Sequence, residues 1–464
     1  MIKNKAEFNF DDLYILFGPN AVKNFPEDFT STGVSIDTRT IEEGNCFIPL
    51  KGTNQDGHDR IEEAFEKGAS FALANTLWCR QNPELLEKYK IIQVKNTESA
   101  LAYLANHHRE KFRGPIIAVA GSNGKTTTKE LIASVLSTKY NVLKTYKNFN
   151  NQLGVPLMLL ALNDTYDIAV LEIATNSVGE IERLCKVCEP THGVITNIGK
   201  EHLELLVDLD GVELEETALF TYLRQNTGLA FINMDDERLG RYPQVIEKRF
   251  AYGTKQGNVT ALVKYDEDHF PIMKIKYDNN IIDAKINVPG YPGAINALAA
   301  ASIGIALHID FDEIKKGLQS YKADDSDNYG RLKIQNHNGI RIINDTYNAN
   351  PSSMMSAMNT LVDMKINGNK YVAIGDMLEM GDEANKEHKE IYSFAIDNFE
   401  KVYLFGDEFS KVHDELSSNK AFYFYNKSEL IADLNSNLNE DDALLVKGSR
   451  GMKMEEVVLG VLNS

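Results

Sequence analysis

The sequence has no hydrophobic run of membrane-spanning length. Nowhere in its 464 residues does a stretch approach the roughly 18 uninterrupted apolar residues of a transmembrane helix. The first residues, MIKNKAEFNFDDLY, also lack the apolar core of a secretory signal peptide. We therefore expect a cytoplasmic protein without a membrane span.

Cysteine is also scarce, and basic residues are fewer than acidic ones. Four cysteines are too few for the disulfide framework of a small secreted domain. Cys185 and Cys188 form a CxxC pair, but a zinc site would need a second pair or suitably spaced histidines, so we interpret both as ordinary helix residues. Acidic residues outnumber basic ones by 67 to 49, and the net charge of −18 disfavours nucleic-acid binding. Small anions can still bind where positive groups are gathered locally.

The length and the order of predicted elements indicate an α/β protein of three domains. We place these at residues 1–112, 113–323 and 324–464, with the polar segment ADDSDNYG as the linker before the third. The first domain contains a predicted strand, CFIPL, and a predicted helix in DRIEEAFEKGAS. We expect Asp59 to cap this helix, with Glu62 three residues further on.

The second and third segments contain β-branched runs separated by polar turns or helical patterns. DIAVLEIA and HGVITNI are predicted strands of the second segment. In the third, YVAIGD, KVYLFGD, AFYFY and ALLVKGS alternate with helix-like sequence, which predicts a parallel sheet covered by helices. Ligands of such sheets bind at the carboxyl ends of strands, where GDM, GDE and KGSR fall.

The most informative stretch is IIAVAGSNGKTTTKE, in which an apolar strand meets a glycine loop and then a helix expected from about Thr126. GSNGKT matches the second half of the P-loop pattern GxxxxGK[ST], although Val119 occupies the position of the first glycine. Gly121 and Gly124 allow N–H groups to turn inward, and Lys125 adds a positive charge beside the helix N-terminus. The alternative is a glycine-rich turn without a ligand. The residues expected to bind nucleotide here are Gly121, Ser122, Asn123, Gly124, Lys125, Thr126 and Thr127.

Two side chains at neighbouring strand ends are candidate metal ligands. Glu172 ends the strand in DIAVLEIA, and His202 follows the strand HGVITNI and its glycine turn. Beside a phosphate loop, these groups and the Thr126 hydroxyl could hold Mg²⁺. A single Glu or His is more often structural or solvated, and it is their place at strand ends beside the loop that favours a functional role.

Several motifs resemble those of the ATP-dependent Mur ligase family. They are GSNGKTTTKE, NFNNQLGVPL, NIGKEHLE, NDTYNANP and VKGSR, and SIDTRTIEEGNCFIPLKGTNQDGHD resembles that family's uridine-nucleotide domain. The similarity extends over nearly the whole chain. It implies an N-terminal α/β domain that binds a UDP-linked substrate, a central P-loop ATPase-type domain with a mostly parallel sheet, and a C-terminal Rossmann-like ligase domain.

The resemblance also implies an activity. Family members are ADP-forming, amide-bond-forming ligases of peptidoglycan synthesis, and hence of cell-wall biogenesis, cell shape and cell division. The closest motifs belong to the branch that joins a D-alanyl-D-alanine dipeptide to UDP-N-acetylmuramoyl-tripeptide. With ATP and Mg²⁺, the substrate carboxylate becomes an acyl phosphate, which the amine then attacks. We expect a monomer.

Individual residue roles follow from the same resemblance. The catalytic residues would be Lys125, Glu172 and His202. Mg²⁺ would be held by Thr126, Glu172 and His202. ATP would also contact Asn296, Arg331 and Asp345. The acyl end of the UDP-linked substrate would face Asn148, Asn150, Asn151, Thr175 and Asn176. Its uridine diphosphate would be held by Ser35, Asp37, Thr38, Arg39, Lys51 and Gly52. The incoming amine or the closing domain would face Tyr347, Asn348, Asn350, Lys447 and Ser449. Each residue taken singly could instead be a turn or surface residue.

The sequence departs from the family pattern at two places. The family usually carries a lysine shortly after HLE, which CO2 modifies to a carbamate that helps to bind a second Mg²⁺. No lysine occurs at positions 201–247, and the simplest alignment places Glu216 there. We hypothesise that Glu216 supplies the metal-site carboxylate directly, the alternative being a solvated helix face. Separately, the family's HN before Asn296 is replaced by Pro292 and Gly293, which removes two polar side chains from the nucleotide pocket.

Three other functions remain open. A paralogue could join a different acid and amine, and a panel of substrates would distinguish it. A catalytically inactive binding partner with this fold would fail to bind Mg-ATP. A simple hydrolytic NTPase would turn over ATP without either substrate.

Overall fold

The structure is a computed structural model that describes residues 3–53, 55–322 and 328–464. The first five residues of the predicted linker, 323–327, lie outside the described residues. The α/β class is confirmed. In these ranges no helix combines the length and hydrophobicity needed to cross a bilayer.

The chain forms two compact units. The first comprises Met1–Ala118, Tyr140–Ala174 and Glu180–His192, and the second comprises Val119–Lys139, Thr175–Gly179 and Gly193–Ser464. The predicted domain boundaries at residues 112 and 323 stay predictions.

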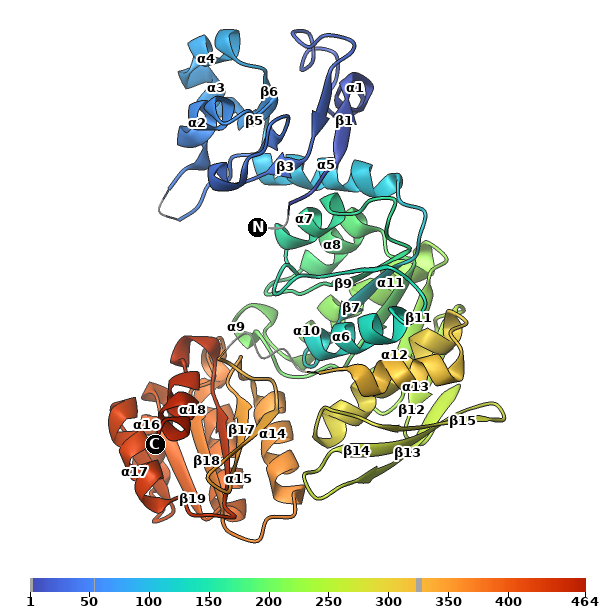
Figure 1. Cartoon of the computed structure of the whole chain (residues 1–464). Helices are drawn as coiled ribbons and strands as arrows, with labels where there is room; N and C mark the ends of the chain where they lie inside the picture. The colour runs from blue at the N-terminus through green and yellow to red at the C-terminus, as the bar shows by residue number, and fades with distance from the viewer. Residues whose placement is uncertain (1–2, 54, 323–327) are drawn as a thin grey trace. The chain divides into compact units, whose positions relative to one another are not determined.

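The N-terminal part contains a two-stranded antiparallel pair, β1–β2, and a four-stranded parallel sheet in the order β3-β4-β5-β6 (Figure 1). Its strands are β1 (Glu7–Asn9), β2 (Thr30–Thr32), β3 (Val34–Ser35), β4 (Cys46–Phe47), β5 (Phe71–Asn75) and β6 (Ile91–Val94). Its helices are α1 (Phe10–Phe17), α2 (Ile61–Glu66), α3 (Thr76–Gln81), α4 (Pro83–Lys88) and α5 (Thr97–Glu110), with 3-10 turns η1 (Thr38–Thr40) and η2 (Gly57–Arg60). Phe47, Ile61 and Ala72 belong to its buried core.

The start of α2 differs from the prediction. Asp59 does not cap this helix, because residues 57–60 already form the turn η2 and α2 begins at Ile61 without a side-chain cap. Asp56 caps the turn instead, accepting a hydrogen bond from the His58 N–H at 3.0 Å. The helical periodicity is confirmed, since Ile61 and Ala64 are buried on one face.

The central sheet has nine strands in the order β15-β14-β13-β12-β11-β10-β7-β9-β8. These strands are β7 (Ile116–Ala120), β8 (Val142–Lys144), β9 (Ile168–Glu172), β10 (His192–Ile195), β11 (Leu229–Asn233), β12 (Arg249–Gly253), β13 (Val259–Tyr265), β14 (Pro271–Tyr277) and β15 (Asn280–Lys285). The last three form an antiparallel extension. The associated helices are α6 (Lys125–Leu136), α7 (Gly154–Leu160), α8 (Glu180–Cys188), α9 (Leu203–Leu206), α10 (Leu209–Glu216), α11 (Ala218–Gln225), α12 (Gly290–Ala306) and α13 (Phe311–Ser320), with the turn η3 (Leu239–Gln244).

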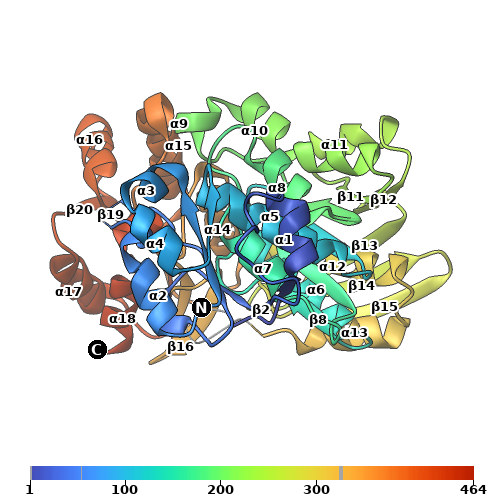
Figure 2. The same ribbon diagram turned by 90° about the horizontal axis from the view of Figure 1, so that it is seen from above.

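Helix α6, which follows the phosphate loop, packs against α12 and α13 (Figures 1 and 2). Gly317 of α13 permits this approach, because a Cβ there would lie 2.5 Å from the Val135 backbone. The Gly317 carbonyl also accepts a hydrogen bond from Ser134 Oγ at 2.7 Å. The helix behind the loop is therefore fixed by close packing.

The C-terminal sheet has the order β16-β17-β21-β18-β19-β20 and is parallel except for β16. Its strands are β16 (Lys333–His337), β17 (Ile340–Asp345), β18 (Lys370–Gly375), β19 (Lys401–Phe405), β20 (Ala421–Phe424) and β21 (Ala443–Lys447). Its helices and turns are α14 (Pro351–Asp363), η4 (Gly381–Glu383), α15 (Ala384–Asn398), α16 (Asp407–Leu416), α17 (Lys427–Asn437), η5 (Arg450–Met452) and α18 (Glu455–Leu462). Helices α14–α16 pack on one face and α17 and α18 on the other, so helices cover both faces as predicted.

All four cysteines are free and buried. Burial raises the pKa of the Cys188 thiol to about 12 and that of Cys79 to about 11. Because metals and electrophiles react with thiolates, such thiols are poor ligands and weak nucleophiles at neutral pH. This supports the interpretation of Cys188 as an ordinary residue of α8, and Cys185 is buried on the same helix.

The imidazole of His192, at the start of β10, gives one pH-dependent prediction. Burial lowers its pKa to about 4, whereas an unfolded histidine titrates near about 6.5. Between these pH values the unfolded chain binds more protons than the folded chain. The contribution of the neutral His192 side chain to the stability of the fold is therefore full above about pH 6.5 and is lost as the pH falls toward 4. We expect the difference in unfolding free energy between wild type and His192→Gln to shrink over this window, by at most about 1.4 kcal/mol per pH unit. Urea unfolding at several pH values measures it, and a constant difference would contradict the prediction.

Candidate functional site

The phosphate loop connects β7 to α6 through two glycines in the left-handed region of backbone space. Gly121 has φ of 111° and Gly124 has φ of 79°, conformations that side chains rarely adopt. A Cβ at Gly121 would also lie 2.3 Å from Thr196 Oγ1. Both the turn and the close approach of the next loop therefore require glycine at this position.

The segment after β10 braces the phosphate loop. The Ser122 N–H donates to the Asn197 carbonyl at 2.9 Å, and the Asn123 N–H donates to Asn197 Oδ1 at 3.1 Å. Ser122 Oγ accepts from the Gly199 N–H at 2.8 Å and donates to its carbonyl at 3.0 Å. The N–H groups of Ser122 and Asn123 and the Ser122 hydroxyl therefore donate to acceptors within the protein. The N–H groups in the first turn of α6 have no acceptors within the helix, and these are the groups suited to bind an anion.

Lys125 lies over this loop beside a carboxylate. Its Nζ donates to the Gly121 carbonyl at 2.5 Å and to the Ser122 carbonyl at 3.3 Å. It also forms an ion pair with Glu201 Oε2 at 3.6 Å. The ammonium group is therefore held next to the start of α6, where a bound phosphate would sit.

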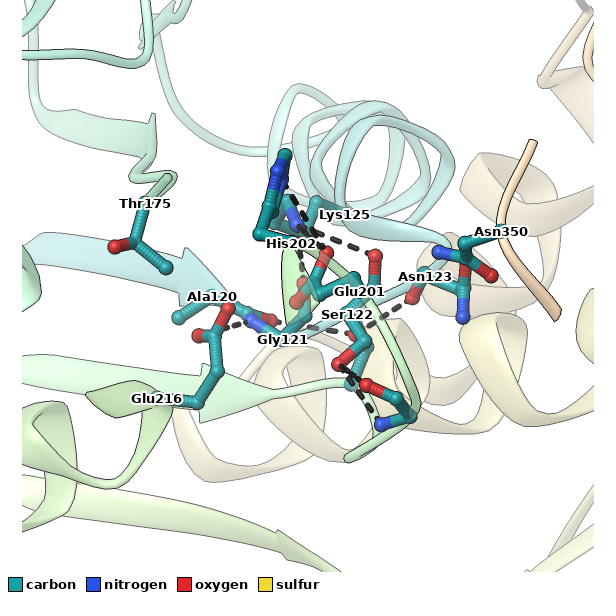
Figure 3. A network of polar contacts seen from close by, with 12 residues as sticks. Ala120, Gly121, Ser122, Asn123, Lys125, Thr175, Glu201, His202, Glu216 and Asn350 are labelled. Carbon is teal, nitrogen blue, oxygen red and sulfur yellow. Dashed lines mark hydrogen bonds and ion pairs between the residues drawn. The ribbon is translucent and has the colours of Figure 1, made fainter. Parts of the chain in front are cut away.

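Glu216 is fully buried beneath the loop (Figure 3). Its Oε2 accepts a hydrogen bond from the Gly121 N–H at 2.7 Å. Burial raises the pKa of Glu216 to about 8, and Glu201 adds to this rise, whereas Lys125 and the Gly121 N–H oppose it. The alternative that Glu216 lies on a solvated helix face is wrong.

Several buried carboxylates in the described part of the chain have an oxygen that accepts no hydrogen bond, and three of them belong to the predicted site or lie next to its residues. They are Glu172, Glu201 and Glu216. Among the described residues, no three His, Cys, Asp or Glu side chains converge closely enough to bind a metal alone. Mg²⁺ is usually held by one or two carboxylates together with substrate phosphates and water, and the orphaned oxygens of Glu201 and Glu216, in the unit that contains the phosphate loop, fit such use. The ligand roles of Thr126, Glu172, His202 and Glu216 stay predictions.

Sequence analysis missed Glu201. It is 5% exposed and pairs with Lys125. Its position next to His202 in GKEHLE is the only sequence feature that could have indicated it, and its burial depends on tertiary packing.

The segment containing His202 also contacts the C-terminal sheet domain. His202 Nδ1 lies 2.6 Å from Glu379 Oε2, and both residues have left-handed backbones. Lys200 forms an ion pair at 2.5 Å with Glu387, whose side chain is buried. Leu203 and Leu206 of α9 pack into the core formed by α14–α16. The segment is therefore anchored at one end on the phosphate loop and at the other in the C-terminal domain.

The asparagines predicted to face the acyl substrate have defined partners. Asn150 Nδ2 donates to Glu172 Oε1 at 2.8 Å, which orients that carboxylate at the end of β9. Asn151 Oδ1 accepts from the Gly154 N–H at 2.9 Å at the start of α7. In the second unit, Thr175 Oγ1 donates to Glu215 Oε1 at 3.1 Å. Asn148 and Asn176 lie in the same two loops.

The residues predicted to hold uridine diphosphate form two turns of the N-terminal part. Ser35, at the end of β3, donates to the Asp37 carbonyl at 2.9 Å, and Thr38 follows in η1. Asp37 and Arg39 form an ion pair at 2.6 Å, and the guanidinium lowers the pKa of the Asp37 carboxyl. Lys51 and Gly52 lie in a second turn, closed by the Gly52 N–H and the Gln55 carbonyl at 2.9 Å.

In the C-terminal domain, Asp345 and Lys447 neutralise each other at the ends of β17 and β21. Lys447 Nζ lies 2.6 Å from Asp345 Oδ2 and donates to the Asn348 carbonyl at 2.8 Å. Ser449 Oγ donates to the Ala349 carbonyl at 3.2 Å. Asn350 caps α14, and its Nδ2 donates to Asn123 Oδ1 of the phosphate loop at 3.0 Å.

The GDM sequence is a structural element. Asp376 turns inward from the end of β18 and accepts hydrogen bonds from the N–H groups of Glu408 at 2.9 Å and Phe409 at 3.0 Å. It thereby caps α16, which begins at Asp407 of the GDE sequence. Asp376 therefore does not face the ligand expected at this strand end, because its carboxylate oxygens accept hydrogen bonds from the start of α16.

The Pro292–Gly293 departure has a local explanation. A Cβ at Gly293 would lie 1.9 Å from the Val288 carbonyl oxygen, so glycine is required by the close turn before α12. Asn296 lies on the same helix with its buried amide against Gly124, where a Cβ would be 3.0 Å away. Asn296, which was predicted to contact the adenine, therefore lies against the phosphate loop.

Three family models match the chain. The Mur ligase middle domain matches residues 119–304, the Mur ligase glutamate ligase domain matches 330–450, and the Mur ligase family catalytic domain matches 30–109. The chain belongs to the Mur ligase family.

Among its relatives, the UDP-N-acetylmuramoyl-tripeptide--D-alanyl-D-alanine ligase of Bacillus subtilis is 34% identical over 93% of each chain. The enzyme of the same name from Escherichia coli is 32% identical over 93% of this chain and 94% of its own.

Solved structures agree with this relationship. A MurF crystal structure from Acinetobacter baumannii superposes with a TM-score of 0.88 at 27% identity, covering 99% of this chain and 100% of that one. MurF from Thermotoga maritima, in complex with ADP, gives a TM-score of 0.81 at 26% identity over 93% and 97% of the two chains.

Proposed function

We propose that the chain is an ATP-dependent ligase that joins D-alanyl-D-alanine to UDP-N-acetylmuramoyl-tripeptide. The observation that most supports this is the braced phosphate loop with Lys125, Glu201 and Glu216 around it. It lies in a chain that matches ligases of that name over more than nine-tenths of its length.

The reaction proceeds in two steps. A carboxylate oxygen of the tripeptide attacks the γ-phosphorus of ATP, and ADP leaves. The dipeptide amine then attacks the acyl carbon, forming the amide and expelling phosphate. Phosphorylation is needed because a carboxylate is a poor electrophile without a good leaving group.

The chain's own residues bind and orient the groups that react. N–H groups at the start of α6 and the Lys125 ammonium stabilise the negative charge on the transferred phosphoryl group. Glu216 fixes the loop by accepting from Gly121, and Asn150 orients Glu172. Thr126, His202 and the carboxylates of Glu172 and Glu216 would hold Mg²⁺. When bound, the ion would polarise the phosphoryl oxygens as a Lewis acid.

Product analysis tests the proposal. The purified protein is incubated with ATP, Mg²⁺, UDP-N-acetylmuramoyl-tripeptide and D-alanyl-D-alanine, and the products are identified by mass spectrometry. We expect the pentapeptide amide and one ADP for each amide, with little ATP turnover when either substrate is omitted. A panel of other acids and amines serves as the comparison. A stronger product signal with another pair would refute the assigned substrates, and substrate-independent hydrolysis would refute ligation.

A further inference from the structure

Two arginines and two tyrosines form a stack at the carboxyl ends of β17 and β21. Arg331 Cζ lies 3.4 Å from the ring centroid of Tyr347, and Arg450 Cζ lies 4.1 Å from that of Tyr329. The two tyrosine centroids are 5.2 Å apart, with the rings inclined at 57°. The stack joins the segment before β16 to the loops after β17 and β21.

The two arginines differ in what else they contact. Arg450 Nη1 donates to Glu455 Oε1 at 2.9 Å, so its guanidinium already has a carboxylate partner. Among the described residues, no carboxylate forms an ion pair with Arg331. Asp345, the acidic residue of the NDTYNANP motif, already pairs with Lys447 and accepts a hydrogen bond from the Leu332 N–H at 3.0 Å.

The Tyr347 ring covers one face of the Arg331 guanidinium, and within the described part of the chain no side-chain hydrogen bond uses its edge. A guanidinium is planar, and its five N–H donors lie in the plane in a fork that matches phosphate. Contact of one face with the Tyr347 ring restricts the tilt of the plane without using any donor. The arginine is therefore preorganised for a planar, two-point contact with an anion.

We propose that Tyr347 is a positioning residue that holds the Arg331 guanidinium for a phosphate group of the nucleotide. This inference rests on the proposed function, and it gives Tyr347 a role other than the predicted one of facing the incoming amine or the closing domain. Tyr347 acts through Arg331, so its contribution should disappear when Arg331 is absent. The phenolic hydroxyl is not required, because the ring face makes the contact.

A double-mutant cycle on nucleotide affinity tests the inference. Calorimetry with Mg²⁺ and a non-hydrolysable ATP analogue gives dissociation constants for wild type, Arg331→Ala, Tyr347→Leu and the double variant. We expect Arg331→Ala to weaken binding about 10- to 100-fold and Tyr347→Leu about fivefold. In the Arg331→Ala background, Tyr347→Leu should have no further effect, and Tyr347→Phe should bind as wild type does.

Tyr329→Leu is the matched control, because it removes the ring beneath Arg450, whose guanidinium is already held by Glu455. We expect it to change affinity less than twofold. A loss as large as that of Tyr347→Leu would overturn the inference, since the stack would then act as a structural unit. Additive effects of Arg331→Ala and Tyr347→Leu would overturn it too. If Tyr347→Leu did not fold, Arg331→Lys would replace it, because lysine keeps the charge without the planar face. We expect Arg331→Lys to bind the ATP analogue about as weakly as Arg331→Ala does. Wild-type affinity of Arg331→Lys would contradict the inference.

The cycle measures binding alone, so its result is separate from that of the product assay. If the effects of Arg331→Ala and Tyr347→Leu on nucleotide affinity were coupled but no amide product formed, the proposed function would be refuted and the positioning role would stand. If the amide formed and the effects of the two substitutions were additive, the proposed function would stand and the positioning role would be refuted.

Discussion

Replacing Lys125 with methionine is expected to lower the rate of amide formation by about 100- to 1000-fold. The ammonium group lies on the carbonyls of Gly121 and Ser122, next to the N-terminus of α6. Methionine keeps most of the side-chain volume and removes the charge that would offset the developing negative charge on the phosphoryl group. The rate is measured from the amide product at saturating ATP.

An exposed lysine provides the control for this substitution. Lys316 on α13 forms a surface ion pair with Glu313 at 3.4 Å, and Lys316→Met should leave the rate within twofold of wild type. Thermal unfolding of both variants shows whether the fold is kept. A loss of less than about tenfold in a folded Lys125→Met protein would count against a phosphate-binding role for the lysine.

Glu216→Gln is expected to raise the Mg²⁺ concentration for half-maximal turnover by at least about tenfold and to lower turnover about 100-fold. Glutamine has nearly the shape of glutamate and can still accept the Gly121 N–H, so the loop should keep its conformation. The substitution therefore removes the group that can ionise to bind a cation and leaves the packing in place. Alanine would be a less specific test, because it would leave both a cavity and an unpaired N–H group.

The control for Glu216 is an acid on the surface of the same part of the chain. The side chain of Glu237 is 92% exposed, and Glu237→Gln should keep wild-type Mg²⁺ dependence. Metal titrations of the steady-state rate compare the two variants. If Glu216→Gln kept both the metal dependence and the turnover of wild type, we would abandon a metal-site role for Glu216.

Local features of the site could be predicted from the sequence because local interactions determine them. The order of apolar strand, glycine loop and helix predicted the phosphate loop, and α6 does begin at Lys125, one residue before the expected position. The strand ending in Glu172 was also predicted, since β-branched runs indicate buried strands. These features need only the neighbouring residues along the chain.

Features that depend on tertiary packing could not be predicted in this way. Glu201 reads as a surface acid, yet it is buried beside Lys125 through contacts between separate loops. Asp376 reads as a strand-end ligand, but it caps a helix more than thirty residues further along the chain. Asp59 does not have its predicted capping role, because a 3-10 turn occupies residues 57–60 and the helix starts one residue later than expected. The sequence shows which residue types are present, and only packing decides which of them face each other.

Transfer of oxygen from the acid to the released phosphate is the most direct test of the acyl-phosphate route. UDP-N-acetylmuramoyl-tripeptide is labelled with ¹⁸O in the reacting carboxylate and incubated with the protein, ATP, Mg²⁺ and D-alanyl-D-alanine. If the carboxylate is phosphorylated, each phosphate released with an amide carries one oxygen from the acid. Amide formation accompanied by phosphate without the label would contradict the proposed mechanism.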